Sequence, residues 1–279
     1  MKEEKGKISF IKMHGVGNDY VFIDCFPSAT EAMLRNTDIP ALARRVSERH
    51  TGIGSDGLVL ILPSTEADAR MRIFNADGSE AQMCGNAIRC VGKYLYESGL
   101  CSQPRIFIET LAGIRMLTLH IAGGQVNQVT VNMGVPRVQQ GVLPLKNNPT
   151  GYMSVNMGNP HAVFFRNSVI PEDELRTLGQ QIGTHSHFPE GTNVEFVCVR
   201  NKKELDVRVW ERGSGITLAC GTGACAATVA AIRQGVTDRT VTVHLPGGEL
   251  QVSWENEDRP VYMTGGATEV FRGELNPND

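Results

Sequence analysis

One motif occurs twice in the sequence, and this duplication restricts the folds open to the chain. Met71–Asn86 reads MRIFNADGSEAQMCGN, and Val207–Thr222 reads VRVWERGSGITLACGT. The two copies place Cys84 opposite Cys220 when they are aligned. Each copy begins as an alternating strand, passes through a turn of Gly, Ser and Asp, and brings a Cys-Gly pair to the start of a helix rich in small residues. We therefore expect two similar halves, each with a cysteine at a helix N-terminus.

Three further motifs repeat in the same order. The paired segments are Gly17–Tyr20 with Gly158–His161, Gly54–Gly57 with Gly191–Val194, and the hairpin Ile106–Leu119 with Val241–Trp254. Similarity at one motif arises easily by chance, whereas four motifs in one order indicate an internal duplication.

These patterns predict an α+β fold. We expect two pseudo-symmetric duplicated domains, each a curved, mostly antiparallel β-sheet or barrel around a central helix. The segment Gly223–Ile232 is apolar on all sides, which is typical of a helix buried in a core. The predicted N-terminal half covers residues 1–134, together with residues 266–279 as a returning C-terminal strand. The predicted C-terminal half covers residues 135–265.

The charge and hydropathy of the chain exclude several classes of function. A net charge of −3 over 279 residues offers no basic surface for nucleic acid or for an anionic membrane. No run of about 18 apolar residues is present, which argues against a membrane-spanning helix. The first residues, MKEEKGKISFIKMHG, lack the apolar region of a signal peptide. We expect a cytoplasmic protein.

The seven cysteines indicate reduced thiols rather than a disulfide framework, because their number is odd and no export signal is visible. Their spacing also lacks the C-x2-C pairs of structural zinc sites, so we expect no metal. Five of them have no matched partner bounded by glycine, and we interpret these as inert buried thiols: Cys25, Cys90, Cys101, Cys198 and Cys225.

The symmetric pair Cys84 and Cys220 has a more specific interpretation. A helix N-terminus carries about half a positive charge, which lowers a thiol pKa from about 8.5 and favours the thiolate. The free N–H groups beside it also bind a carboxylate or phosphate. Two such thiols on one substrate could remove a proton from one face of a stereocentre and return a proton to the other face. The sequence thus predicts proton transfer at the Cα of an amino acid.

The same motifs resemble those of the diaminopimelate epimerase family. The matching segments follow the family's order over nearly the whole chain: MHGVGNDYVFID, GIGSDGL, FNADGSEAQMCGNAIRC, VNMGNPHAVFF, GTNVEFV, WERGSGITLACGTGACAA and LPGGEL. The resemblance implies two similar domains and a cofactor-independent interconversion of LL- and meso-diaminopimelate, a step towards lysine and peptidoglycan precursors. It also suggests a homodimer.

The resemblance assigns roles residue by residue. Cys84 and Cys220 would carry the protons, and His161 would support the reacting amine. Glu211 and Arg212 would contact the distal amino acid end of the substrate. The backbone N–H groups of two pairs would bind the reacting carboxylate: Gly85 with Asn86, and Gly221 with Thr222. Four asparagines would hold polar groups of the substrate: Asn18, Asn75, Asn159 and Asn193.

One position departs from the family's pattern. Some relatives carry Gln where this chain has Gly57, so any substrate contact of that Gln must come from elsewhere here.

Two alternatives remain at this point. One is another two-cysteine racemase or isomerase of the same fold, such as a proline racemase. The other is a thiol redox protein that cycles through a disulfide between Cys84 and Cys220, although the chain has no C-x-x-C motif. The polar loops and Glu211-Arg212 favour a substrate with a second amino acid head group over proline.

Overall fold

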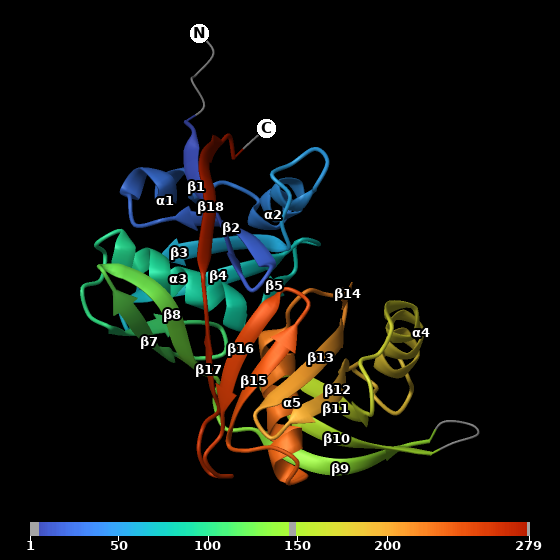
Figure 1. Cartoon of the computed structure of the whole chain (residues 1–279). Helices are drawn as coiled ribbons and strands as arrows, with labels where there is room; N and C mark the ends of the chain where they lie inside the picture. Colours follow the sequence, from blue (N-terminus) through green and yellow to red (C-terminus); the bar gives the residue numbers. More distant parts are fainter. Residues whose placement is uncertain (1–5, 145–148, 278–279) are drawn as a thin grey trace. The chain divides into compact units, whose positions relative to one another are not determined.

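The computed structural model describes residues 6–144 and 149–277, which form two compact units (Figure 1). Unit 1 consists of Met1–Thr130 with Gly266–Asp279, and unit 2 consists of Val131–Gly265. None of the helices in the described ranges is long and apolar enough to cross a membrane.

Unit 1 is a curved mixed sheet with three helices among its described residues. Strand β18 comes from the end of the chain and pairs antiparallel with β1, so it closes the sheet next to the N-terminal strand. The elements are β1 (Ile8–Gly15), β2 (Asn18–Asp24), α1 (Ser28–Arg35), α2 (Ile39–Ser47), β3 (Gly57–Leu62), β4 (Ala69–Asn75), β5 (Glu80–Ala81), α3 (Gly85–Glu97), β6 (Arg105–Glu109), β7 (Arg115–Ala122), β8 (Gln125–Asn132) and β18 (Thr268–Leu275).

Unit 2 repeats this order with two helices in its described part. The elements are β9 (Arg137–Leu143), β10 (Thr150–Asn156), β11 (Pro160–Arg166), α4 (Glu172–Gly183), β12 (Asn193–Asn201), β13 (Glu204–Glu211), β14 (Gly215–Ile216), α5 (Gly221–Arg233), β15 (Thr240–Leu245), β16 (Gly248–Ser253) and β17 (Tyr262–Gly265).

The strand pairing shows the duplication directly. In unit 1, β2 pairs parallel with β3, β3 antiparallel with β4, β4 parallel with β6, and β6 antiparallel with β7. Unit 2 has the same four kinds of pairing. There, β11 pairs parallel with β12, β12 antiparallel with β13, β13 parallel with β15, and β15 antiparallel with β16. The predicted α+β class with duplicated sheets is confirmed, and each sheet contains two parallel pairings within its mainly antiparallel order.

Each sheet curves around one buried helix. Of the thirteen residues of α5, only Thr222 and Arg233 are not buried, and the helix contacts β10–β13, β15 and β16. Its alanines and glycines allow these strands to approach closely, as the all-round apolar pattern predicts. Helix α3 is the counterpart in unit 1 and contacts β1, β2 and β7.

The β1–β2 hairpin turns through Val16 and Gly17, both of which have positive φ angles of 58° and 80°. A β-branched residue rarely adopts this conformation, whereas a two-residue hairpin of this type requires it at both positions. The turn therefore stores strain directly before Asn18, one of the predicted site residues.

Candidate active site

Both predicted cysteines lie at the N-termini of the central helices. Cys84 is the N-cap residue of α3, and Cys220 is the N-cap residue of α5. The predicted placement of one cysteine at a helix start in each half is confirmed. Because the first turn of a helix leaves N–H groups without intrahelical acceptors, Gly85-Asn86 and Gly221-Thr222 each present such groups beside a thiol.

In unit 1, Cys84 lies between a hydroxyl and an amide. The Tyr20 hydroxyl donates to Cys84 Sγ at 3.7 Å, and the thiol lies 3.5 Å from Asn18 Oδ1, which can accept its proton. Asn86 Nδ2 donates to the same oxygen at 3.2 Å. Burial, with the charge of the neighbouring Cys84, raises the pKa of Tyr20 well above its usual value, so its hydroxyl stays a donor.

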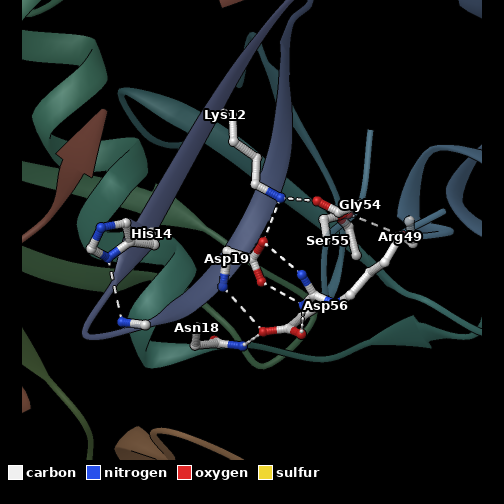
Figure 2. A network of polar contacts seen from close by, with 11 residues as sticks. Lys12, His14, Asn18, Asp19, Arg49, Gly54, Ser55 and Asp56 are labelled. Carbon is white, nitrogen blue, oxygen red and sulfur yellow. Dashed lines mark hydrogen bonds and ion pairs between the residues drawn. The ribbon is translucent and has the colours of Figure 1, made fainter. Parts of the chain in front are cut away.

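A network of charges behind Asn18 fixes the orientation of its amide (Figure 2). Asn18 Nδ2 donates to Asp56 Oδ2 at 2.7 Å, which leaves Asn18 Oδ1 to face Cys84. Arg49 Nη2 lies 2.8 Å from Asp56 Oδ1 and 2.9 Å from Asp19 Oδ1, so it bridges the two carboxylates. Lys12 Nζ forms an ion pair with Asp19 and donates to the Gly54 carbonyl. The charged network thereby determines which end of the amide meets the thiol.

The pKa values of the two carboxyl groups in this network are shifted in opposite directions. Burial alone would raise the pKa of Asp19, but hydrogen bonds from Arg49 and Lys12 outweigh it and hold that pKa below its ordinary value. Burial and the adjacent negative charge of Asp19 raise the pKa of Asp56.

Asn75 and Gly57 lie beside each other on β4 and β3. Asn75 Nδ2 donates to Ser79 Oγ at 3.0 Å in the turn after β4. A Cβ atom on Gly57 would lie 2.1 Å from the Phe74 carbonyl oxygen and 2.9 Å from the Tyr20 ring. The backbone of this chain therefore has no room for a glutamine at Gly57.

In unit 2, two carboxyl groups lie beside Cys220. The Glu211 carboxyl accepts a hydrogen bond from the Thr217 hydroxyl, and the charges of Glu211 and Glu195 act on the Cys220 thiol. Burial, followed by the charges of Glu211 and Glu195, raises the pKa of Cys220 well above its usual value. The expectation that the helix N-terminus favours the thiolate is therefore wrong at Cys220, because burial and two neighbouring carboxyl groups outweigh the helix.

The other predicted residues of unit 2 lie in hydrogen-bonded contact with this region. Asn159 Nδ2 lies 3.3 Å from Thr222 Oγ1, which lies 3.5 Å from Cys220 Sγ. Asn159 Oδ1 lies 3.0 Å from His161 Nε2. These bonds connect the β11 start to the first turn of α5.

Asn193 joins the same region to Arg212. Its Nδ2 donates to the Pro160 carbonyl at 3.0 Å, and its Oδ1 accepts the backbone N–H of Arg212 at 2.9 Å. The Arg212 guanidinium donates to the Glu190 carbonyl at 3.0 Å. Glu211 and Arg212 thus diverge at the end of β13, with Glu211 at the thiol and Arg212 towards the loop before β12.

The sequence patterns do not single out several residues that contact the predicted site residues, among them Tyr20, Asp56, Glu195 and Thr217. Glu195 carried a usable signal, because it is a charged residue inside the apolar run VEFVCV. Asp56 belongs to the repeated GSDG motif, but its contact with Asn18 depends on tertiary structure.

Three of the remaining five cysteines are buried, as predicted for inert thiols, and the other two are only half-buried. Burial raises the pKa of both Cys25 and Cys90 to about 12. Cys225 is buried within α5, and Cys101 and Cys198 are half-buried.

Comparison with known proteins identifies the family. The family model described as diaminopimelate epimerase matches residues 10–139 and 153–270. The chain belongs to the diaminopimelate epimerase family. It is 49% identical to the diaminopimelate epimerase of Pelotomaculum thermopropionicum, over 95% of this chain and 98% of that one. It is also 49% identical to that of Desulfitobacterium hafniense, over 96% and 98%. Family membership makes the chain an isomerase.

A solved structure supports the fold. A hydroxyproline epimerase from Agrobacterium vitis superposes with a TM-score of 0.73 at 16% identity, covering 100% of this chain and 95% of that one. At this identity the similarity concerns the fold alone, which the two proteins share.

The raised pKa of Cys220 leads to a prediction for its alkylation. Because the thiol form prevails below the pKa, we expect iodoacetamide to react slowly with Cys220 at neutral pH and faster as the pH rises above 9.0, the ordinary thiol value. Glu211→Gln removes one negative charge, so it should accelerate the reaction at a fixed pH near neutrality. Quenched samples analysed by peptide mass spectrometry give the rates. Equal rates in the unchanged protein and in Glu211→Gln would contradict this account.

Proposed function

We propose that the chain interconverts LL- and meso-diaminopimelate by proton transfer between substrate Cα and the two thiols. The observation that carries this proposal is the repeated placement of a cysteine at the N-cap of each central helix, in a chain of the diaminopimelate epimerase family. One thiolate takes the Cα proton, and the opposite thiol gives a proton to the other face of the carbon. The roles reverse for the other isomer.

Helix N-termini are suited to the charge that develops in this reaction. Removal of the Cα proton shifts electron density onto the adjacent carboxylate. The N–H groups of Gly85-Asn86 and Gly221-Thr222 would bind this carboxylate, and such donors are usually the largest electrostatic contribution in a site of this kind. The chemistry needs the two sulfurs on opposite faces of one carbon and requires no cofactor.

Glu211 supports the reaction at Cys220. Burial raises the pKa of its carboxyl above the ordinary value, although the hydrogen bond from Thr217 opposes this. A carboxylate with a raised pKa is a better proton acceptor. Protonation of Glu211 would remove its negative charge beside Cys220, so it would favour the thiolate when Cys220 has to act as the base.

The polar side chains around the two thiols would hold the rest of the substrate. We assign this role to Asn18, Asn75, Asn159, Asn193 and Arg212, with His161 in support. The proposed division into epimerase halves is 1–134 with 266–279, and 135–265. A cytoplasmic location stays a prediction from the sequence.

Proton NMR of LL-diaminopimelate in D2O with the reduced protein tests this function. We expect the α-proton signal to disappear while the meso isomer forms, and proline in a parallel sample to keep its α-proton. Exchange of proline alone would instead support the racemase alternative. No exchange of either substrate by folded, reduced protein would refute the proposal.

We also propose a homodimer, with β18 as part of the interface. Val270 and Phe271 on this strand are 55% and 45% exposed. Exposed apolar side chains on a terminal strand are a common basis for association. We expect Phe271→Asp to lower the mass measured by light scattering from two chains to one, while exposed Glu66→Gln leaves it unchanged. A monomeric unmodified protein would contradict the dimer.

A further inference from the structure

A buried titratable pair lies behind Cys220 in unit 2. His161 Nδ1 and Glu195 Oε1 are 2.7 Å apart, and both side chains are 0% exposed. His161 lies on β11 and Glu195 on β12, where these strands run parallel and the register pairs Val163 with Glu195. Since side chains alternate along a strand, His161 and Glu195 share one face of the sheet, the face that α5 covers.

A continuous series of polar contacts leads from this pair to the Cys220 sulfur. His161 Nε2 is 3.0 Å from Asn159 Oδ1, and the other end of that amide, Nδ2, is 3.3 Å from Thr222 Oγ1. Thr222 Oγ1 is 3.5 Å from Cys220 Sγ. If the Asn159 amide donates to Thr222, the threonine hydroxyl keeps its own proton for the sulfur.

With Glu195 ionised, the two hydrogen bonds of His161 take two ring protons. Both ring nitrogens face oxygen acceptors, Glu195 Oε1 and Asn159 Oδ1, and only an imidazolium donates at both positions. The ionisable groups beside the ring are Glu195, Glu211 and Cys220, so an imidazolium is the one positive charge among them. A fully buried carboxylate needs such a partner, and Glu195 Oε2 has no hydrogen-bond partner among the described residues.

Gly223 provides the space for this arrangement. A Cβ atom there would lie 2.9 Å from Glu195 Oε1 and 3.2 Å from Cys220 Sγ. The Glu195 carboxyl therefore reaches the first turn of α5, where the positive end of the helix also favours its negative charge.

We propose that Glu195 is a positioning residue that holds His161 as an imidazolium. Through Asn159, this keeps the Thr222 hydroxyl directed at Cys220. The hydroxyl then stabilises the thiolate that forms when Cys220 acts as a base, so this inference rests on the proposed function. Without the Glu195 carboxylate, the His161 ring loses its acceptor at Nδ1, the Asn159 amide loses its fixed partner, and the sulfur loses its donor.

Nitrogen-15 NMR of the histidine rings tests the proton count without substrate. We expect two ring N–H signals from His161 between about pH 7 and pH 9, assigned by their loss in His161→Gln. Glu195→Gln should retain at most one of them. A single N–H signal in the unmodified protein would overturn the proposal, and this result does not depend on whether the protein is an epimerase.

Kinetics test the consequence at Cys220. We expect Glu195→Gln to lower kcat/KM about tenfold, the effect of losing one hydrogen bond to a charged group, and to move the rising limb of its pH profile to higher pH. Glu249→Gln is the matched control, because Glu249 also bonds a histidine Nδ1, that of His244 at 3.0 Å, but is 64% exposed. An unchanged pH profile in a folded Glu195→Gln protein would refute the positioning role. Inactivity of the unmodified protein would refute the epimerase and leave the NMR result standing.

Discussion

Cys84→Ala and Cys220→Ala are each expected to slow the loss of the diaminopimelate α-proton by about 10²- to 10⁴-fold, the usual contribution of a general acid or base. Each substitution removes one of two proton carriers, and either direction of the reaction uses both. The double substitution should be little worse than either single one, because residues that act as a unit are not additive. Initial rates in D2O, from both isomers, measure these effects.

Cys101→Ala is the control for this experiment. Cys101 is half-buried and lies outside both clusters, and burial raises its pKa, so its removal should leave the rate within about twofold. A Cys84→Ala or Cys220→Ala protein that is folded and still exchanges the α-proton at the unmodified rate would refute the two-thiol mechanism.

Lys12→Met is expected to lower the free energy of unfolding by about 1.5–3 kcal/mol, the usual cost of losing a hydrogen bond to a charged group, because Arg49 still pairs with Asp19. The side chain of Lys12 is 7% exposed, that of its partner Asp19 is 17% exposed, and Lys12 also donates to the Gly54 carbonyl. Lys7→Met is the control, because Lys7 and Glu274 are 70% and 59% exposed and such a surface pair contributes about 0–1 kcal/mol. Urea unfolding followed by circular dichroism gives both values.

The difference in unfolding free energy between Lys12→Met and the unmodified protein should depend on pH, because it depends on the ionisation of Asp19. The pKa of Asp19 lies below its ordinary value of 3.8 in the folded protein, so the ionised group stabilises the fold above about pH 3.8. The contribution is lost as the pH falls through the lower, folded value. The difference between Lys12→Met and the unmodified protein should therefore shrink in acid. If the difference in unfolding free energy stays constant down to the lowest pH at which the protein is folded, the effect of Lys12→Met comes from packing and not from the ion pair.

The sequence alone predicts the parts of the fold that depend on local pattern. The helix starts at Cys84 and Cys220 follow from glycine-bounded motifs, and the burial of α5 follows from its uniformly apolar residues. The patterns do not identify α1, β9 or β10 as elements. Strand β9, for example, alternates only weakly between buried and exposed positions, and its pairing with β10 is a tertiary contact.

The pKa shift of Cys220 could not be predicted from the sequence. Cys220 meets Glu211 and Glu195 only after β12, β13 and α5 have packed, so the sign of its pKa shift depends on long-range contacts. The resemblance assigns Glu211 to the distal end of the substrate, whereas in the structure its charge also acts on the Cys220 thiol. The family motifs identify the residues of the site, and the tertiary structure determines which of these residues are in contact.

The pairing of β1 with β18 has a consequence for synthesis on the ribosome. Strand β1, from Ile8, is translated before unit 2, whereas its partner β18, around Leu275, is translated after unit 2. Unit 2 has all its strands before that point. The C-terminal unit can thus complete its sheet first, while the N-terminal unit waits with the edge of β1 open. A nascent chain that stalls before residue 268 would expose this edge, so loss of β18 should destabilise unit 1 at β1, far away in the sequence.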